Sequence, residues 1–527
     1  MNINIDSYSN TANPSHDISV SISHHGNDTE LSKFPQINSM TVNNNAKDQL
    51  WKKIRANEFI TIDNNGNILD ENRCIINVGD RLCAQIENIR VKYGETSVSR
   101  NTFSRFINVK EIVLPDSVCE IGEDSCTCLY SLQKINIPSK VKTISRYAFR
   151  RCVSLRHVTI PDGLTSIEDC AFRECKSLSG IKLPNSLVSI GRHAFDGCKK
   201  LVEIRIPNSV NDIGSCAFKD CDSLSFIKLP ESLTVIKSYL FENCNSLSDV
   251  IMPKLVEKID AGAFYRCGFL RTIGLKDGLE YIGPLAFYGC SNLSKIEIPN
   301  TVSYIGESAF TGCLLLQSIV IPEKVKNIYD NTFMDCYNLR DVSLGTELEL
   351  IGSKAFFNCE KLSGICIHRN VQEIGDKAFG NCLNLKKFGL PYKLNIAGDH
   401  IFLNCFELNE VHLPSLPPLN LYDSLKDLRS LSTIVSPRRS PCNMVIHKVL
   451  NDAKEFTGNF SQLNKLVNGN KIYDNLKDLR SLSTIVSPKG SPCNMVIHKV
   501  LNNTKEIPGN CSQLNKFVNG NKIINIK

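Results

Sequence analysis

The stretch LRHVTIPDGLTSIEDCAFRECKS, residues 155–177, is one copy of a 23-residue unit that recurs along most of the chain. A column of cysteine repeats every 23 residues from Cys152 to Cys405 without slippage, and a column of phenylalanine lies three residues ahead of it, from Phe149 to Phe402. A fixed period of this length is typical of repeat architectures, in which each unit packs on its neighbours. The sequence therefore predicts an array of similar coils over residues 101–415.

Each unit predicts a short strand, a turn and a second inward-facing segment. Val158 and Ile160 are two residues apart, so on a strand they face the same side. Pro161 ends this strand, because proline cannot donate to a continuing ladder. The apolar residues of 164–172 then return inward. Glycine follows the isoleucine of this segment in many units but Glu168 replaces it here, so the corner does not require a positive φ.

No single unit can bury its own apolar residues, but stacked units cover one another and form a continuous core. About 14 coils spaced by about 4.8 Å would form a rod roughly 65 Å long. The predicted fold class is a mainly β solenoid, followed by a small α-helical tandem repeat.

The pattern L-x-x-I-x-I-P-x-x-V-x-x-I-G-x-x-A-F-x-x-C, which extends from Leu201 to Cys221, resembles the BspA-like leucine-rich repeat family. The resemblance covers about 60% of the chain. It implies a curved, mainly β leucine-rich repeat superhelix that binds other macromolecules and is often found on bacterial and protist surface proteins. It implies no catalytic residues.

The segment before the repeats divides into two parts. Residues 1–46 are rich in Asn and Ser and poor in apolar clusters, which predicts disorder because too little burial is available to offset the entropy of ordering. Residues 47–100 hold the only tryptophan, Trp51, and mixed apolar runs. We expect them to cap the first coil, whose apolar face would otherwise be exposed.

A tandem duplication follows the repeats. Residues 425–472 recur as 476–523 with a shift of 51 and eight differences over 48 positions. Leu425, Leu428, Leu431 and Ile434 keep near-helical spacing. This spacing predicts two small helical units, 422–473 and 474–527, the first of which is a candidate cap for the solenoid.

Charge and hydropathy bear on the compartment. The chain has a net charge of +7, while residues 422–527 alone carry 16 basic and 7 acidic residues, a net +9. No apolar run approaches the roughly 20 residues of a membrane span, and the first 30 residues have neither the basic nor the apolar region of a secretion signal. These features favour a cytoplasmic protein, with surface exposure not excluded.

The cysteine column has three possible interpretations. Stacked residues about 5 Å apart are within disulfide range, and cysteines are also common zinc ligands. Closed zinc sites, however, arrange their ligands around one point rather than along a line. Because cysteine behaves as a small buried hydrophobe and no secretion signal is evident, we predict free thiols.

The search for reactive or ligand-binding groups gives little. Cys442 with His447, repeated as Cys493 with His498, would supply four metal ligands, but on a helix the two side chains of each pair diverge by roughly 140°. Ser-Pro pairs at 436, 440, 487 and 491 are turns or phosphorylation sites. We find no nucleotide-binding, hydrolase or zinc motif. The sequence therefore predicts no enzymatic activity, no cofactor and no metal.

The outward strand face is the remaining candidate site. Its positions vary from unit to unit, whereas the inward columns are uniform, and Lys182, Arg205 and Lys228 place three basic residues on adjacent coils. The alternatives are a solvated set of like charges and a site for an acidic partner. The predicted partner-binding residues are Lys182, Arg205, Lys228, His157, Glu203 and Phe226.

Three functions are compatible with these features. The first is a non-enzymatic, monomeric scaffold that binds a protein partner through the outward strand face. The second is a cell-surface adhesin of BspA type. The third is a nucleic-acid-associated protein that uses the basic tail, although no interleaving of aromatic and basic residues supports it.

Overall fold

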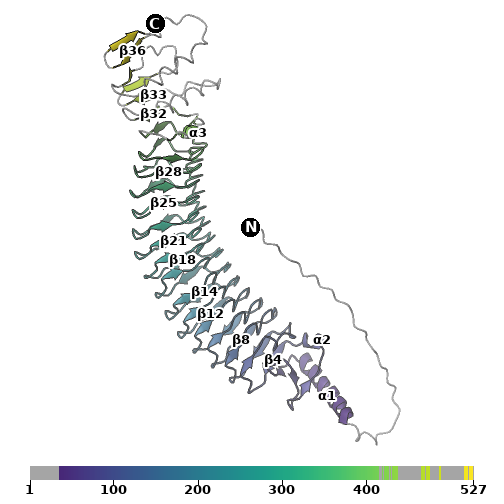
Figure 1. Cartoon of the computed structure of the whole chain (residues 1–527). Coiled ribbons are helices and arrows are strands. Elements are labelled where there is room, and N and C mark those ends of the chain that lie inside the picture. The colour runs from purple at the N-terminus through teal and green to yellow at the C-terminus, as the bar shows by residue number, and fades with distance from the viewer. Residues whose placement is uncertain are drawn as a thin grey trace, which may run out of the picture.

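The computed structural model describes residues 35–414 and, further along the chain, residues 418, 421–425, 428, 430–431, 433–436, 465–468, 471–474, 486–487, 516–519 and 522–525. Figure 1 shows similar coils stacked into one curved rod, with helix α1 (Pro35–Arg55) near one end and α3 (Leu421–Leu425) near the other. The predicted β solenoid of about 14 turns is confirmed.

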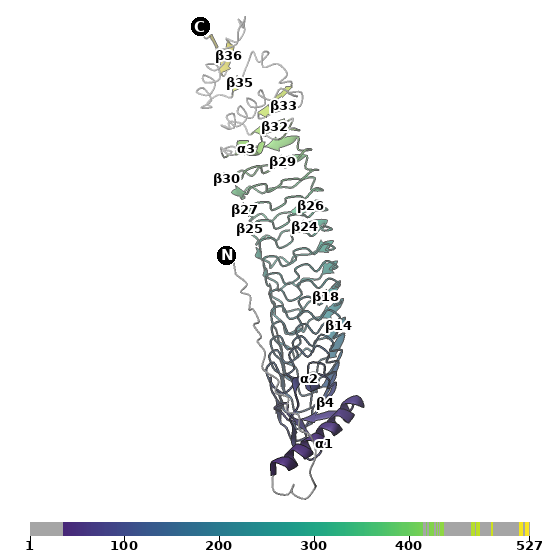
Figure 2. The same ribbon diagram turned by 90° about the vertical axis from the view of Figure 1, so that its right-hand side faces the viewer.

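Nearly every coil contributes to two rows of parallel strands, which lie along two sides of the rod (Figure 2). Strands pair with the strands 23 residues further on, as Ile181 does with Ile204 and Ile190 with Ile213. The first strand row consists of β4 (Asn88–Val91), β6 (Glu111–Val113), β8 (Lys134–Asn136), β10 (His157–Thr159), β12 (Gly180–Lys182), β14 (Glu203–Arg205), β16 (Phe226–Lys228), β18 (Asp249–Ile251), β20 (Thr272–Ile273), β22 (Lys295–Ile296), β24 (Ser318–Val320), β26 (Asp341–Ser343), β29 (Lys387–Gly389) and β31 (Glu410–His412).

The second strand row lies after the proline turn of each coil. Its strands consist of two residues each, of which the second is an isoleucine in every strand but the first and the last. This second residue is buried throughout the row. The strands are β5 (Ser97–Val98), β7 (Glu120–Ile121), β9 (Thr143–Ile144), β11 (Ser166–Ile167), β13 (Ser189–Ile190), β15 (Asp212–Ile213), β17 (Val235–Ile236), β19 (Lys258–Ile259), β21 (Tyr281–Ile282), β23 (Tyr304–Ile305), β25 (Asn327–Ile328), β27 (Leu350–Ile351), β28 (Glu373–Ile374) and β30 (Ile396–Ala397).

The phenylalanine column forms a continuous stack inside the rod. From Phe149 to Phe379, successive ring centroids are 5.3 to 5.8 Å apart, and every ring is fully buried. Phe218 stacks on Phe195 at 5.6 Å and on Phe241 at 5.8 Å. The predicted register is therefore confirmed.

The cysteine column forms a ladder of hydrogen bonds rather than cross-links. From Cys175 to Cys405, each Sγ donates to the backbone carbonyl of the phenylalanine 26 residues earlier, at 3.0 to 3.4 Å. All of these cysteines are free thiols, as predicted. Burial raises the pKa of each thiol, to about 12 for Cys290. The column thus supplies a small apolar group and a hydrogen-bond donor to a carbonyl inside the core.

The turn around the phenylalanine contains two left-handed positions that the sequence analysis missed. The residue five before each column cysteine has a positive φ, as in His193 (53°), and so does the residue directly before the cysteine, as in Asn243 (58°). The second position is rich in Gly, Asn and Asp, the residues that adopt this conformation at least cost. That enrichment in the sequence could have indicated the left-handed position before each column cysteine.

Glycine at the isoleucine corner has a different cause. Gly214 does not have a positive φ, in agreement with the expectation for this corner. A Cβ at Gly214 would instead lie 2.4 Å from the backbone nitrogen of Arg192 in the preceding coil. Close approach of adjacent coils therefore favours glycine here.

Replacing Gly214 by alanine should lower the free energy of unfolding by about 1 to 3 kcal/mol, because the two coils must separate to admit the methyl group. Chemical denaturation followed by circular dichroism measures the change. Gly180→Ala is the matched control, since a Cβ at Gly180 has no atom within 4 Å. Equal losses for the two variants would contradict this explanation.

The N-terminal end differs from a simple coil. Strands β1 (Ile60–Ile62), β2 (Ile68–Leu69) and β3 (Ile75–Ile76) extend the first row beyond β4 in an antiparallel meander, and α2 (Asp80–Cys83) follows them. The 23-residue pairing already begins at Asn88, which pairs with Glu111. Regular coils therefore start within the segment 47–100 that we assigned to the cap.

The predicted N-terminal disorder needs one correction. Residues 35–46 belong to helix α1, and residues 1–34 lie outside the described residues. Leu50 is buried against the core, with Ala46 and Ile54 partly buried beside it. This packing stabilises a helix that the Asn-rich composition of its first half does not indicate.

The described part of the tail has strands where we expected helices. Ile434, which we placed on a helix with Leu425, lies in β32 (Thr433–Ser436) and pairs with Val411 of β31, 23 residues earlier. The spacing of these apolar residues thus continues the solenoid register, and α3 is only five residues long. The other strands are β33 (Lys465–Asn468), β34 (Lys471–Asp474), β35 (Val486–Ser487), β36 (Lys516–Asn519) and β37 (Lys522–Asn525). The rest of the two predicted helical units lies outside the described residues.

Candidate interaction surface

The outward side chains of the first strand row form the candidate surface. In β12, β14, β16 and β18 the middle residue is buried and its two neighbours are exposed. This alternation follows from the period of two along a strand, because the middle isoleucine or valine faces the core. All six predicted partner-binding residues are exposed on this row.

The six residues lie on four consecutive strands of this row, β10, β12, β14 and β16. Lys182 of β12 lies opposite Arg205 of β14, and Glu203 lies opposite Phe226 of β16. Lys228 is at the other end of β16. His157 lies on β10, the strand next to β12, where its pairing partner is Lys134 of β8.

The three basic residues share this face with acidic side chains. The Nε atom of Arg205 donates to Oε1 of Glu203 at 2.8 Å, and this contact raises the pKa of the guanidinium. Asp249 of β18 lies opposite Phe226. Because these groups are exposed, their ion pairs add little to stability but determine the charges that a partner meets.

Apolar side chains occupy the same face. Phe226 is 39% exposed, and Ile251 of β18, opposite Lys228, is 43% exposed. Sequence reasoning did not single out Asp249 or Ile251, although they stand in the same two outward columns. We call the following residues the strand-face patch: Lys182, Glu203, Arg205, Phe226, Lys228, Asp249 and Ile251.

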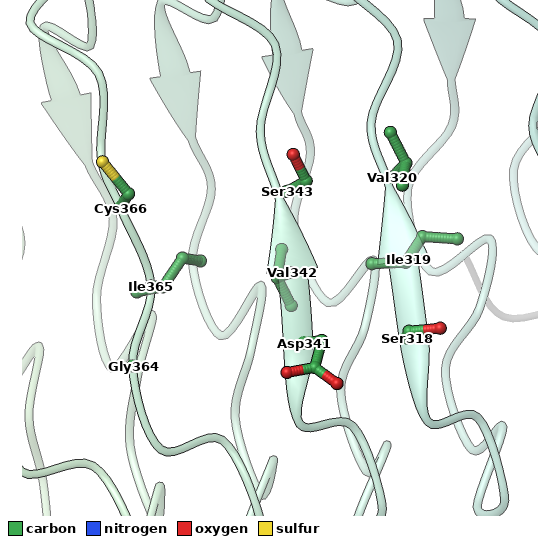
Figure 3. A pocket seen from close by; sticks show the side chains of 9 residues that line it. All are labelled: Ser318, Ile319, Val320, Asp341, Val342, Ser343, Gly364, Ile365 and Cys366. Atoms are coloured by element: carbon green, nitrogen blue, oxygen red, sulfur yellow. The ribbon is translucent and has the colours of Figure 1, made fainter.

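A second feature of this face is a break in the first strand row. Residues 364–366 form no strand, and a shallow hollow of about 280 Å³ lies beside β24 and β26 (Figure 3). Gly364 leaves its floor without a side chain, while Cys366 is exposed at its wall. The hollow is small and open, and we assign no ligand to it.

The described residues offer no metal centre: within them, no three His, Cys, Asp or Glu side chains are grouped as metal ligands would be. Cys442, His447, Cys493 and His498 lie outside the described residues. Within the described part of the chain, no helix is long and apolar enough to cross a membrane.

Comparison with known proteins agrees with this architecture. The BspA type leucine rich repeat region matches the chain in six copies, over residues 81–198, 142–270, 257–385 and 329–432. A leucine-rich repeat protein from Bacteroides ovatus is 30% identical, with a TM-score of 0.59, over 66% of this chain and 90% of that chain. No curated protein shows significant similarity.

Two further solved structures match the chain. A leucine rich repeat protein from T. pallidum is 31% identical over 36% of this chain and 86% of that chain, with a TM-score of 0.29. A leucine rich cell surface protein from Faecalibacterium prausnitzii is 22% identical over 73% of this chain and 95% of that chain, with a TM-score of 0.38.

The family match extends from residue 81 to residue 432 and coincides with the stacked coils of the structure. Its end lies within the tail, where β32 adds one more strand in the 23-residue register. The chain therefore belongs to the BspA type leucine-rich repeat family.

Proposed function

We propose that this chain is a non-enzymatic scaffold that binds a protein partner through the strand-face patch. The observation that carries the proposal is the contrast between the two sides of each first-row strand. The inward residues repeat from coil to coil because they fill a uniform core, whereas the outward residues differ in charge, size and polarity along the row. Packing does not require that variety, so we attribute it to recognition.

The mixture of groups in the patch favours a protein over a nucleic acid. Three basic side chains stand beside two acidic ones, and Arg205 is already paired with Glu203. A nucleic acid would meet repulsion at both carboxylates, since binding to phosphates depends on uncompensated positive charge. A protein surface with complementary charges around an apolar centre suits Phe226 and Ile251, because protein interfaces place apolar and aromatic groups inside a polar rim.

Replacing Lys182, Arg205 and Lys228 together by glutamate should weaken partner binding at least tenfold, or about 1.4 kcal/mol. Folding should remain nearly unchanged, because exposed substitutions usually alter stability by less than about 0.5 kcal/mol. The partner is first identified by crosslinking it to the immobilised full chain. Titration of this partner against the wild-type chain and against the triple variant then measures the two affinities.

The control is a second triple charge reversal away from the patch. Lys140, Lys254 and Lys324 are exposed and follow the proline turns, outside both strand rows. Their replacement by glutamate changes the net charge equally but leaves the patch intact. If both triple variants lose the same affinity, or neither loses any, the strand-face patch is not the binding site.

The adhesin alternative differs in the location of the protein, which would be the cell surface. Staining of intact cells with an antibody against the solenoid tests this alternative, because an adhesin is labelled without permeabilisation. The nucleic-acid alternative predicts salt-dependent retention on RNA that disappears when the basic tail is removed.

A further inference from the structure

The first copy of the tail duplication is the terminal coil of the solenoid. Strand β32 pairs in parallel with β31, which matches Glu410 with Thr433 and His412 with Val435. Leu428 and Leu431 are buried and stand 23 residues after Cys405 and Leu408. The first copy therefore continues both the strand row and the core.

A hairpin completes this terminal unit. Strand β33 pairs in parallel with β32, matching Val435 with Val467, and β34 folds back antiparallel on β33. The pairing thus changes from parallel to antiparallel, and among the described residues β34 is the last strand of this sheet. We call β32, β33 and β34 the first cap.

The second copy of the duplication repeats the same pairings. Strand β35 matches Val486 with Val518 of β36, 51 residues after the pair Val435 and Val467. Strand β37 folds back on β36, and Lys516 pairs with Asn525 as Lys465 pairs with Asp474. We call β35, β36 and β37 the second cap.

The two caps differ in one respect. Strand β32 lies between β31 and β33, whereas β35 ends a three-stranded sheet and, within the described residues, has no strand on its other edge. That edge corresponds to the one through which β32 pairs with β31. An open strand edge presents unpaired N–H and C=O groups to another chain.

The end of this chain's own solenoid is already occupied. The Oγ atom of Ser424, a buried residue, accepts a hydrogen bond from the backbone N–H of Ile401 at 3.0 Å and donates one to the carbonyl of Gly398 at 2.9 Å. The equivalent residue of the second copy is Asn475, which is longer. Asn475 lacks the hydroxyl that makes these two hydrogen bonds, so we expect the first copy to bind the last coil more tightly than the second copy.

We propose that the second cap docks through β35 on the last coil of a second copy of this chain, where it takes the place of that molecule's first cap. The occupant follows from the duplication, because the second cap carries the edge that already pairs with β31 in this fold. Exchange of a repeated element between identical chains needs no new type of contact. Because Asn475 lacks the hydroxyl of Ser424, we expect the association to be weak and dependent on concentration.

The first test measures mass against concentration. Sedimentation of the full 58.8 kDa chain should show a fraction of twice this mass that grows with concentration, and a chain ending at residue 475, which retains β34, should remain monomeric. Asn475→Ser should increase the dimer fraction several-fold, because it restores the side chain that fits the last coil. A full chain that stays monomeric at all concentrations, or a shortened chain that forms dimers to the same extent as the full chain, would overturn the proposal.

The second test identifies the strands that pair. Because His412 pairs with Val435, it should pair with Val486 of the other molecule after exchange. Mixing a His412→Cys chain with a Val486→Cys chain under mild oxidation should give a crosslink between these residues, since paired strands are within disulfide range. A crosslink that forms only when one chain carries both cysteines would show docking within a single molecule and reject exchange.

Discussion

Replacing Phe218 by alanine is expected to lower the free energy of unfolding of the rod by about 3 to 5 kcal/mol. The ring is fully buried and stacks on Phe195 at 5.6 Å and Phe241 at 5.8 Å, so its removal interrupts a column that has no solvent-accessible side. The cavity cannot collapse easily, because the hydrogen bonds between successive coils hold the backbone on each side. Urea denaturation measures the loss.

The Phe218→Ala substitution can also be tested by locating the coils that lose stability. In a solenoid each coil contacts only its neighbours, so stability is close to a sum of coil and interface terms. Hydrogen exchange should therefore rise most in the coils that carry Phe195 and Phe241 and remain near wild type at the two ends. Phe226→Ala is the matched control, because Phe226 is 39% exposed on the strand face. A loss as large in the control would contradict the stacked-core explanation.

Raising the pH above about 9 is expected to unfold the rod over a narrow range. Burial raises the pKa of the column thiols, to about 12 for Cys290 and for Cys405, whereas cysteine in an unfolded chain has a pKa of about 8.5. Above that value the unfolded chain releases protons that the folded rod retains. The free energy of unfolding should then fall by about 1.4 kcal/mol per pH unit for each buried thiol.

The size of this effect follows from the repeat. Twelve column cysteines, from Cys152 to Cys405, are buried, so together they should lower the free energy of unfolding by about 16 kcal/mol per pH unit. The contribution of the protonated thiols to stability is complete below pH 8.5 and disappears as the pH rises towards 12. Urea midpoints at pH 7, 8, 9 and 10 measure it, and an unchanged midpoint between pH 8 and pH 10 would disprove the mechanism.

Two cysteine variants distinguish the contribution of the buried thiols to this pH dependence from that of the exposed thiols. Cys221→Ala combined with Cys244→Ala should make the dependence on pH shallower by about a sixth, since two of the twelve column thiols are gone. Replacing the exposed Cys74, Cys119 and Cys366 by alanine should leave the dependence unchanged. Among the cysteines that the structure describes, an alkylating reagent should modify these three first in the native rod at neutral pH, because buried thiols react only when the structure opens locally.

The sequence by itself determined the period, the buried columns and the stacking of coils. A phenylalanine and a cysteine that recur every 23 residues can all be buried only if successive units lie directly on one another, and Phe218 and Cys221 stand in just those columns. The state of the thiols followed as well, because fully buried cysteine is a small apolar residue unless a compartment oxidises it.

The tail and the charges of the exposed face were decided only by the tertiary structure. Leu425, Leu428, Leu431 and Ile434 fit a helix and a solenoid coil equally well by spacing, and the free edge of β31 selects the strand. Arg205 and Lys182 look alike in sequence, but the structure pairs Arg205 with Glu203 on the same strand. The local sequence pattern specifies which residues are buried. It does not choose between two structures that bury the same residues, or between two possible partners of an exposed charge. Those choices depend on which strand or side chain lies alongside in space.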